Sequence, residues 1–388
     1  MDGVDKIIQK VEERGDAALI ELTQKYDGVE LANIEVSADE IRRAFKNADE
    51  NLVSNLKAAA KNIKSYAEKS MPKLSSEYSN PGVRITDRLI PVESAGVYVP
   101  GGEYPYPSTV LMTAIPARVA GVEDIYMVSP PGNLSDAVLA AASIAGVDRI
   151  FRVGGAQAVA ALAYGTETVP KADMVVGPGN SYVQAAKRKL SNSGHIGIDM
   201  LAGPSEVVII GDSSASGDIT AIDLMAQAEH AEDASATLLT DSKELLEKTK
   251  KNIDEKYKSR IELIYTESLS DAVKISNNLA PEHLQVICSS ENSDRILEGI
   301  KNAGAVFVGA YTPVAVGDYW AGPSHTLPTG MTAKFSEGLN VRTFLKKISF
   351  MFCSKNGLDE ISKSIESLAN EEGMKYHARS VSERKKEK

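Results

Sequence analysis

The chain has 388 residues, of which 43% are hydrophobic and 25% charged, as in an ordinary globular protein. Its formal net charge of -10 argues against nucleic acid or an anionic membrane as a main partner. The N-terminus lacks an apolar signal region and no apolar run reaches bilayer length, so we expect a cytoplasmic protein without membrane contact. Because Cys288 and Cys353 have no CxxC neighbour, we expect no disulfides.

The first 70 residues are predicted to be helical. Apolar residues recur at helical spacing up to Asp27-Gly28, where a glycine favours the end of a helix. Ser37 and Glu40 are spaced as a capping box, which predicts that another helix begins after Ser37. The helical pattern then continues until Pro72 and the polar stretch SSEYSNPG break it.

From about residue 83, short β-branched runs alternate with glycine loops and alanine-rich helices. This alternation predicts a parallel sheet covered by helices, and such sheets bind ligands beyond the carboxyl ends of their strands. Three glycine loops fall at those ends: Gly101-Gly102, Gly154-Gly155 and Gly177-Pro178-Gly179. The loops could present N–H groups to a phosphate, but none matches GxGxxG, so simple tight turns remain an alternative.

A second α/β stretch follows, with strands predicted at SEVVIIGD, ATLLTD, IELIYTE, LQVIC and AVFVGA. From about residue 350 the chain becomes charged and helical, and the final SERKKEK is expected to be a solvated end. The predicted fold class is therefore α/β, with two incomplete Rossmann-like parallel-sheet domains and a small helical C-terminal tail domain.

Histidines are few, so the setting of each is informative. Of the five, His230, His283, His325 and His377 lie in polar, motif-like segments. Glu282 directly precedes His283, and a carboxylate close to an imidazole suits general acid–base chemistry near neutral pH. Taken alone, the pair is better read as a helix N-terminus, where a glutamate is favourable.

Gln227 and His230 are three residues apart in a segment that reads as a helix, so they would share one helix face. Together with Asp318 and His377 they offer nitrogen and oxygen donors that a catalytic zinc accepts. Glutamine is an uncommon ligand and no dense motif such as HExxH is present, so an ordinary polar stripe is the alternative.

Eight segments carry more than local chemistry: GVYVPGG, STVLM…PARVAG, VGGAQAVAALAYGT, VVGPGN, AGPSE, QAEH, APEHL and AGPSHTLPT. In their order and approximate spacing, from about residue 10 to the tail, the chain resembles the histidinol dehydrogenase family. The resemblance implies a zinc-dependent, NAD-linked dehydrogenase with one zinc per subunit. Such an enzyme oxidises L-histidinol, through bound L-histidinal, to L-histidine with two NAD⁺, at the end of histidine biosynthesis.

The resemblance also implies roles for individual residues. The implied zinc ligands, which also contact substrate, are Gln227, His230, Asp318 and His377, the last from the partner subunit of a homodimer. Further substrate contacts are implied for Ser205, His283, His325 and Glu372, and NAD contacts for Tyr98, Gln157 and Asn180. His283 would take protons from the substrate, and Glu282 would activate the water that attacks the aldehyde.

Three domains are expected. Residues 97–206 would bind NAD, and residues 1–96 with 207–348 would form a discontinuous α/β domain that holds the zinc ligands and the acid–base pair. Residues 349–388 would form a helical tail that enters the partner's active site. The N-terminus is shorter than in many family members. Cys288 and Cys353 fall outside the motifs, which disfavours a thiohemiacetal mechanism.

Two alternatives remain open. A family member could oxidise another polar alcohol, such as a sulfonated diol, although Glu372 and His325 argue against an anionic substrate head. A catalytically silent homologue is disfavoured, because every expected acid, base and ligand residue is present.

Overall fold

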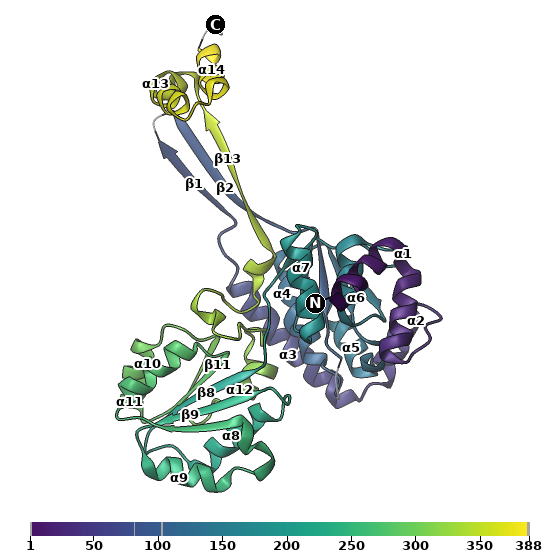
Figure 1. Cartoon of the computed structure of the whole chain (residues 1–388), viewed down its shortest axis with the longest axis vertical. Coiled ribbons are helices and arrows are strands. Elements are labelled where there is room, and N and C mark those ends of the chain that lie inside the picture. The colour runs from purple at the N-terminus through teal and green to yellow at the C-terminus, as the bar shows by residue number, and fades with distance from the viewer. Residues whose placement is uncertain (1, 81, 102–103, 386–388) are drawn as a thin grey trace. The chain divides into compact units, whose positions relative to one another are not determined.

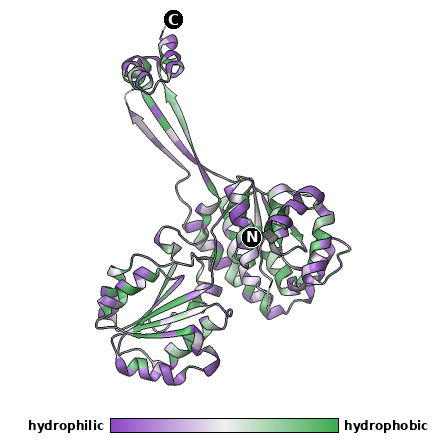
Figure 2. Cartoon of the chain, viewed as in Figure 1, coloured by the Kyte–Doolittle hydropathy of each residue, from purple (hydrophilic) through white to green (hydrophobic). Residues whose placement is uncertain are grey.

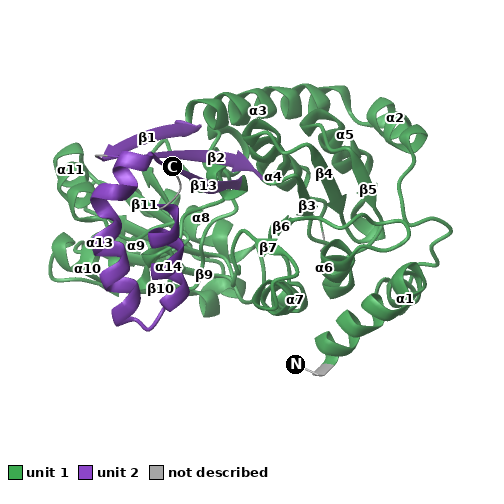
Figure 3. Ribbon diagram, turned by 90° about the horizontal axis from the view of Figure 1, so that it is seen from above, with its two compact units in different colours: residues 1–70, 92–344 green, residues 71–91, 345–388 purple. Residues whose placement is uncertain are grey.

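The computed structural model describes most of the chain, namely residues 2–80, 82–101 and 104–385. It divides into two compact units (Figure 3), formed by Met1–Ser70 with Val92–Phe344 and by Met71–Pro91 with Leu345–Lys388. Gly102, which the sequence places in the first glycine loop, lies outside the described residues.

The first unit contains a five-stranded parallel sheet in the order β5-β4-β3-β6-β7. Its strands are β3 (Ser94–Tyr98), β4 (Asp124–Val128), β5 (Arg149–Phe151), β6 (Met174–Val176) and β7 (Gly197–Ile198). The helices between them are α4 (Pro107–Ala120), α5 (Asp136–Ala145), α6 (Gly155–Tyr164) and α7 (Ser181–Asn192). Every residue of the central β3 is buried, because helices cover both faces of a parallel sheet.

Three N-terminal helices add to the helical layers around this sheet (Figure 1), namely α1 (Asp2–Asp27), α2 (Ala38–Asn47) and α3 (Glu50–Lys69). The predicted capping box of Ser37 and Glu40 is present. Helix α1 contacts α6 and α7, α2 contacts α5, and α3 contacts α4 and α5. This differs from the expected division, which grouped residues 1–96 with the second sheet. The reason is that apolar residues of α1, among them Ile7 and Leu19, share a core with Phe151 and Leu162.

A second five-stranded parallel sheet, in the order β10-β9-β8-β11-β12, completes the first unit. Its strands are β8 (Glu206–Gly211), β9 (Ser235–Thr240), β10 (Ile261–Tyr265), β11 (His283–Ile287) and β12 (Ala305–Val308). Its helices are α8 (Gly217–Ala228), α9 (Lys243–Asn252), α10 (Leu269–Leu279) and α11 (Ser290–Gly299). Val207 and Ile209 point into one core and Val208 and Ile210 into another, as the two-residue period of a strand requires. Both parallel sheets confirm the predicted fold class.

Apolar residues concentrate in the strands of these two sheets, and polar residues in the outer faces of the helices (Figure 2). Across the described residues, none of the helices is both long enough and apolar enough to span a bilayer.

The second unit is a three-stranded antiparallel sheet with two helices. Its elements are β1 (Ser75–Asn80), β2 (Val83–Pro91), β13 (Leu345–Cys353), α13 (Lys355–Glu371) and α14 (Lys375–Arg384). The sequence did not predict this sheet: β1 was read as a break, and β13 covers the start of the expected helical tail. Gly82 has φ +75°, and a Cβ on it would lie 2.0 Å from the Gly357 Cα, so the hairpin turn approaches α13 too closely for a side chain.

A fully buried ion pair holds the glycine loop that follows β6. Lys187 and Asp199 have no exposed side-chain surface, and the Lys187 Nζ lies 2.5 Å from the Asp199 Oδ1. The Lys187 Nζ also donates to the Gly177 carbonyl at 3.0 Å, and the Gly177 N–H donates to the Asp199 Oδ2 at 2.8 Å. Both backbone groups of Gly177 are therefore fixed by one pair of charges.

Replacing Lys187 by methionine is expected to destabilise the protein by about 3–5 kcal/mol, because it leaves the Asp199 carboxylate buried without a counter-ion. Lys189→Met is the matched control, since Lys189 lies on the same helix in a half-exposed pair with Asp5 and should cost less than about 1 kcal/mol. Urea unfolding followed by circular dichroism measures both changes. Equal, small losses for the two variants would contradict the expectation.

Candidate active site

The acid–base candidates lie at the amino edge of the second sheet. His283 is the first residue of β11 and is paired with Val207 of β8, so Glu282 and Glu206 lie at the same edge. Glu282 and His283 are 6% and 5% exposed. The alternative that this pair begins a helix is therefore wrong, because the segment enters the sheet between β8 and β12.

Backbone groups orient both side chains. The Glu206 N–H donates to the Glu282 Oε2 at 3.0 Å, and the Ser205 side chain also hydrogen-bonds to this carboxyl. The His283 Nδ1 lies 3.4 Å from the Glu206 carbonyl and 3.5 Å from the Glu282 Oε2. Because a carbonyl can only accept, Nδ1 carries the proton in this contact and Nε2 keeps a free lone pair. The His283 Nε2 is buried and has no hydrogen-bond partner among the described residues.

Burial sets the protonation states at this edge. It lowers the pKa of His283 to about 4 and raises that of Glu282 to about 8. It also raises the pKa of Asp318 to about 6 and that of Glu206 above its ordinary value. The imidazole is therefore neutral at pH 7, as a general base must be, whereas Glu282 ionises only near pH 8 unless a cation lies beside it.

Helix α8 carries Gln227 in its last turn and ends at Ala228. His230 lies just beyond the helix, exposed, with its Nδ1 2.9 Å from the Ala226 carbonyl. Gln227 is 3% exposed, and its Nε2 has no hydrogen-bond partner among the described residues. One turn earlier, the Asp223 Oδ2 accepts a hydrogen bond of 2.9 Å from the Gln285 Nε2 of β11, which ties α8 to the strand that carries His283.

A single turn of π-helix, Gly317–Ala321, follows α12 (Val314–Val316) and holds Asp318. The Asp318 Oδ1 is 3.9 Å from the His283 Nε2, and burial raises the pKa of Asp318 more than the electrostatic interaction with His230 lowers it. The His325 Nδ1 lies 3.1 Å from the Asp318 carbonyl, and its Nε2 lies 3.3 Å from the Thr109 Oγ1 in the first turn of α4. This loop thus connects the second sheet to a helix of the first.

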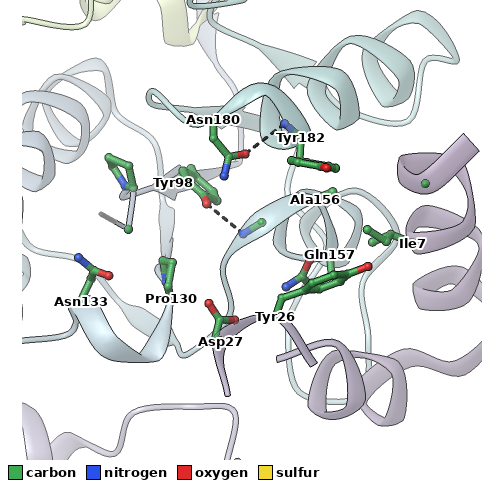
Figure 4. Close-up of a pocket in the computed structure, with 14 residues that line it drawn as sticks. Ile7, Tyr26, Asp27, Tyr98, Pro130, Asn133, Ala156, Gln157, Asn180 and Tyr182 are labelled. Atoms are coloured by element: carbon green, nitrogen blue, oxygen red, sulfur yellow. Dashed lines mark hydrogen bonds between the residues drawn. The ribbon is translucent and has the colours of Figure 1, made fainter. Parts of the chain in front are cut away.

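A cavity of about 520 Å³ opens at the carboxyl edge of the first sheet (Figure 4). Tyr98, Gln157 and Asn180 all line it, which brings together the three residues expected at the cofactor. The Gly155 N–H donates to the Tyr98 hydroxyl at 3.0 Å, and burial raises the pKa of Tyr98 to about 12. Asn180 caps α7 by accepting from the Tyr182 and Val183 N–H groups.

Sequence reasoning missed two parts of these sites. The end of α1 contributes Tyr26 and Asp27 to the cavity, although Asp27-Gly28 was interpreted only as a helix stop. The backbone of Glu206, which follows Ser205 in the AGPSE segment, contacts both Glu282 and His283. The available signal was an acidic residue at the start of a predicted strand.

The remaining expected site residues lie in the second unit. Glu372 caps the C-terminus of α13 and His377 lies in the first turn of α14, and both are exposed. The two cysteines are free. Burial raises the pKa of Cys288 to about 12, which keeps its thiol protonated and unreactive.

Three comparisons place this geometry among known proteins. The family model described as histidinol dehydrogenase matches residues 1–385. A histidinol dehydrogenase of Methanosarcina mazei is 44% identical over 396 aligned positions, which cover 98% of this chain and 90% of that relative. A histidinol dehydrogenase of Geobacter sulfurreducens is also 44% identical, with 98% and 92% covered. The crystal structure of histidinol dehydrogenase from Elizabethkingia anophelis superposes with a TM-score of 0.93 at 36% identity and covers 99% of this chain and 92% of that one. The chain therefore belongs to the histidinol dehydrogenase family.

Proposed function

We propose that this enzyme oxidises L-histidinol, through L-histidinal, to L-histidine with two molecules of NAD⁺. The observation that carries the proposal is the buried, neutral His283, whose Nε2 has no hydrogen-bond partner among the described residues and which lies beside the Glu282 carboxyl. In a chain of this family, an imidazole with a free lone pair and an adjacent carboxyl, once ionised, supply the two proton acceptors that an alcohol oxidation and an aldehyde oxidation need.

We further propose zinc ligation by Gln227, His230, Asp318 and His377 of the partner subunit. Among the residues that the structure describes, no cluster of three or more histidine, cysteine or acidic side chains is arranged to hold a metal. A site completed by an amide and by a second subunit would not form such a cluster in one chain. The raised pKa of Asp318 supports the fit, because a cation would stabilise the ionised form of a carboxyl that burial disfavours. The Gln227 Nε2 is buried without a partner among the described residues, and turning the amide over would place its oxygen, which is a metal donor, in the same space. When bound, zinc would hold the amino and imidazole nitrogens of the substrate as a template.

In the first oxidation, the His283 Nε2 accepts the proton of the substrate hydroxyl while the hydride on the carbinol carbon passes to NAD⁺. The product is the aldehyde, NADH and protonated His283. The contact from Nδ1 to the Glu206 carbonyl keeps the second ring proton in place, so Nε2 is the nitrogen that gains and releases the proton.

In the second oxidation, Glu282 in its ionised form removes a proton from the water that attacks the aldehyde carbon, and the protonated His283 gives its proton to the aldehyde oxygen, which yields the hydrate and a neutral imidazole. His283 then takes the hydroxyl proton of the resulting hydrate as the second hydride leaves for NAD⁺. The balance is one alcohol, one water and two NAD⁺ giving one carboxylate, two NADH and three protons. Ser205, His325 and Glu372 are proposed to contact the substrate.

The cofactor is proposed to lie in the cavity lined by Tyr98, Gln157 and Asn180, within the expected NAD-binding segment, residues 97–206. The glycine-started helix α6 supports this placement, because N–H groups at a helix N-terminus suit a pyrophosphate.

We also propose a cytoplasmic homodimer in which the tail, residues 349–388, completes the partner's site. Apolar side chains of the second unit support a protein partner, since Met351, Leu368, Met374 and Tyr376 are 74%, 67%, 50% and 83% exposed. Two free cysteines are consistent with a reducing compartment.

The direct test measures NADH formed per molecule of L-histidinol by the purified protein, with zinc and after chelation. The expected result is two NADH per substrate, lost on chelation and restored by zinc. The variant His283→Asn removes the proposed base. Its control is His195→Asn, because His195 lies beside Tyr164 and belongs to no proposed site. A folded, zinc-loaded protein that leaves L-histidinol untouched would redirect the proposal to another polar alcohol.

Glu282→Gln is expected to slow aldehyde oxidation by about 100-fold or more while alcohol oxidation falls much less, because only the second step needs a base for water. Stopped-flow absorbance with L-histidinol and with L-histidinal separates the two half-reactions. The exposed Glu291→Gln is the matched control. Equal losses in both half-reactions would contradict the role of Glu282.

Mixing inactive His283→Ala and His377→Ala dimers is expected to restore about a quarter of wild-type turnover after subunit exchange. Random exchange makes about half of the dimers mixed, and each mixed dimer has one intact site if His377 acts across the interface. Mass spectrometry of differently labelled subunits verifies the exchange. Verified exchange without recovery would show that His377 acts within its own chain.

A further inference from the structure

The cavity at the first sheet carries an acid that the proposed cofactor contacts do not use. Helix α1 contributes Gly3, Ile7, Tyr26 and Asp27 to the lining. Among the described residues that line the cavity, Asp27 is the one charged side chain, and neither lysine nor arginine is present. The wall formed by α1 is therefore acidic.

The fold fixes the position of Asp27. It is the last residue of α1, and Gly28 with φ +70° ends the helix there. Gly15 interrupts α1, and the helical part that follows is anchored through Asp16, which accepts hydrogen bonds of 2.6 Å from the Thr166 hydroxyl and 3.2 Å from the Thr168 N–H. The helix C-terminus also adds the negative end of its dipole to the charge of Asp27.

The carboxylate of Asp27 is not paired with another group of the described chain. It makes no hydrogen bond and no ion pair with any residue that the structure describes, and it is exposed to the cavity. Figure 4 shows its carboxylate between Pro130 and Tyr26, on the same side of the cavity as Gln157. Tyr26 and Tyr182 are 54% and 58% exposed and offer aromatic faces in the same cavity. An aromatic surface beside a free carboxylate suits an adenosine, whose base stacks and whose ribose donates hydrogen bonds.

We propose that Asp27 selects NAD over NADP by accepting a hydrogen bond from the 2′-hydroxyl of the adenosine ribose and by repelling a 2′-phosphate. This inference rests on the proposed function, in that the cavity must hold the dinucleotide. A 2′-phosphate would bring a charge of about -1.5 to -2 next to the carboxylate. Within the described lining, no cation is available to neutralise it. Dinucleotide-binding folds commonly place such an acid after a strand of the sheet, whereas here a helix that precedes the sheet supplies it.

The test measures equilibrium binding of NAD⁺ and NADP⁺ by titration calorimetry to the full-length zinc-loaded protein and to Asp27→Asn, Asp27→Arg and Glu30→Gln. The wild type is expected to bind NAD⁺ at least about tenfold more tightly than NADP⁺, and Asp27→Asn is expected to shrink that ratio by about tenfold. Asp27→Arg should shift the preference further toward NADP⁺, because a guanidinium can pair with the phosphate. Glu30→Gln removes an exposed acid outside the cavity and should leave the ratio unchanged.

The outcomes separate this inference from the proposed function. One outcome is NAD⁺ binding with the same ratio of NAD⁺ to NADP⁺ affinity in the wild type, Asp27→Asn and Asp27→Arg. That result overturns the role of Asp27 and leaves the dehydrogenase proposal standing. A wild type that binds both nucleotides equally also overturns it. A folded wild type that binds neither nucleotide overturns the assignment of the cavity and the inference with it. Steady-state turnover with each nucleotide, measured on the same samples, should follow the binding ratios.

Discussion

The constraint that organises the proposed catalytic part of the molecule is the full or partial burial of three carboxyl groups at the sheet edge that carries His283. Glu206, Glu282 and Asp318 all lie near His283, and burial raises the pKa of each of them. N–H groups of the Glu206 and Gly330 backbone satisfy part of this charge. Burial disfavours the ionised forms, so a divalent cation that entered the cluster would compete with protons and favour the ionised carboxylates.

The two parallel sheets are used at opposite edges. In the first sheet, the cavity lies at the carboxyl edge, where open α/β sheets usually bind ligands. In the second, the proposed acid–base pair lies at the amino edge, at the start of β11 and beside the start of β8. The contact of His325 with Thr109 joins the loop of Asp318 to α4 of the first sheet. One histidine thus links the loop beside the second sheet to the layer of helices on the first.

Much of the fold was predictable from local patterns, and the failures have particular causes. The helices of the first 70 residues and both parallel sheets follow from periodicity and capping. The hairpin at residues 75–91 was missed because every residue of β1 is exposed, which leaves no alternation to detect. Glu282-His283 resembled a helix start locally, but pairing with β8 and β12, which is a tertiary interaction, decided its conformation. The individual roles of Gln227 and His377 came from the family resemblance, since the spacing of Gln227 and His230 left a polar stripe open and His377 was placed only on the tail.

The π-helical turn that carries Asp318 also carries the only tryptophan of the sequence, Trp320. Trp320 is 51% exposed, and its carbonyl accepts a hydrogen bond of 3.1 Å from the Asn62 Nδ2 of α3. All tryptophan fluorescence of the chain therefore originates two residues from a proposed metal ligand. The molecule has a built-in optical probe of this loop, whose emission can be followed without labelling or engineering as the carboxylate of Asp318 changes its surroundings.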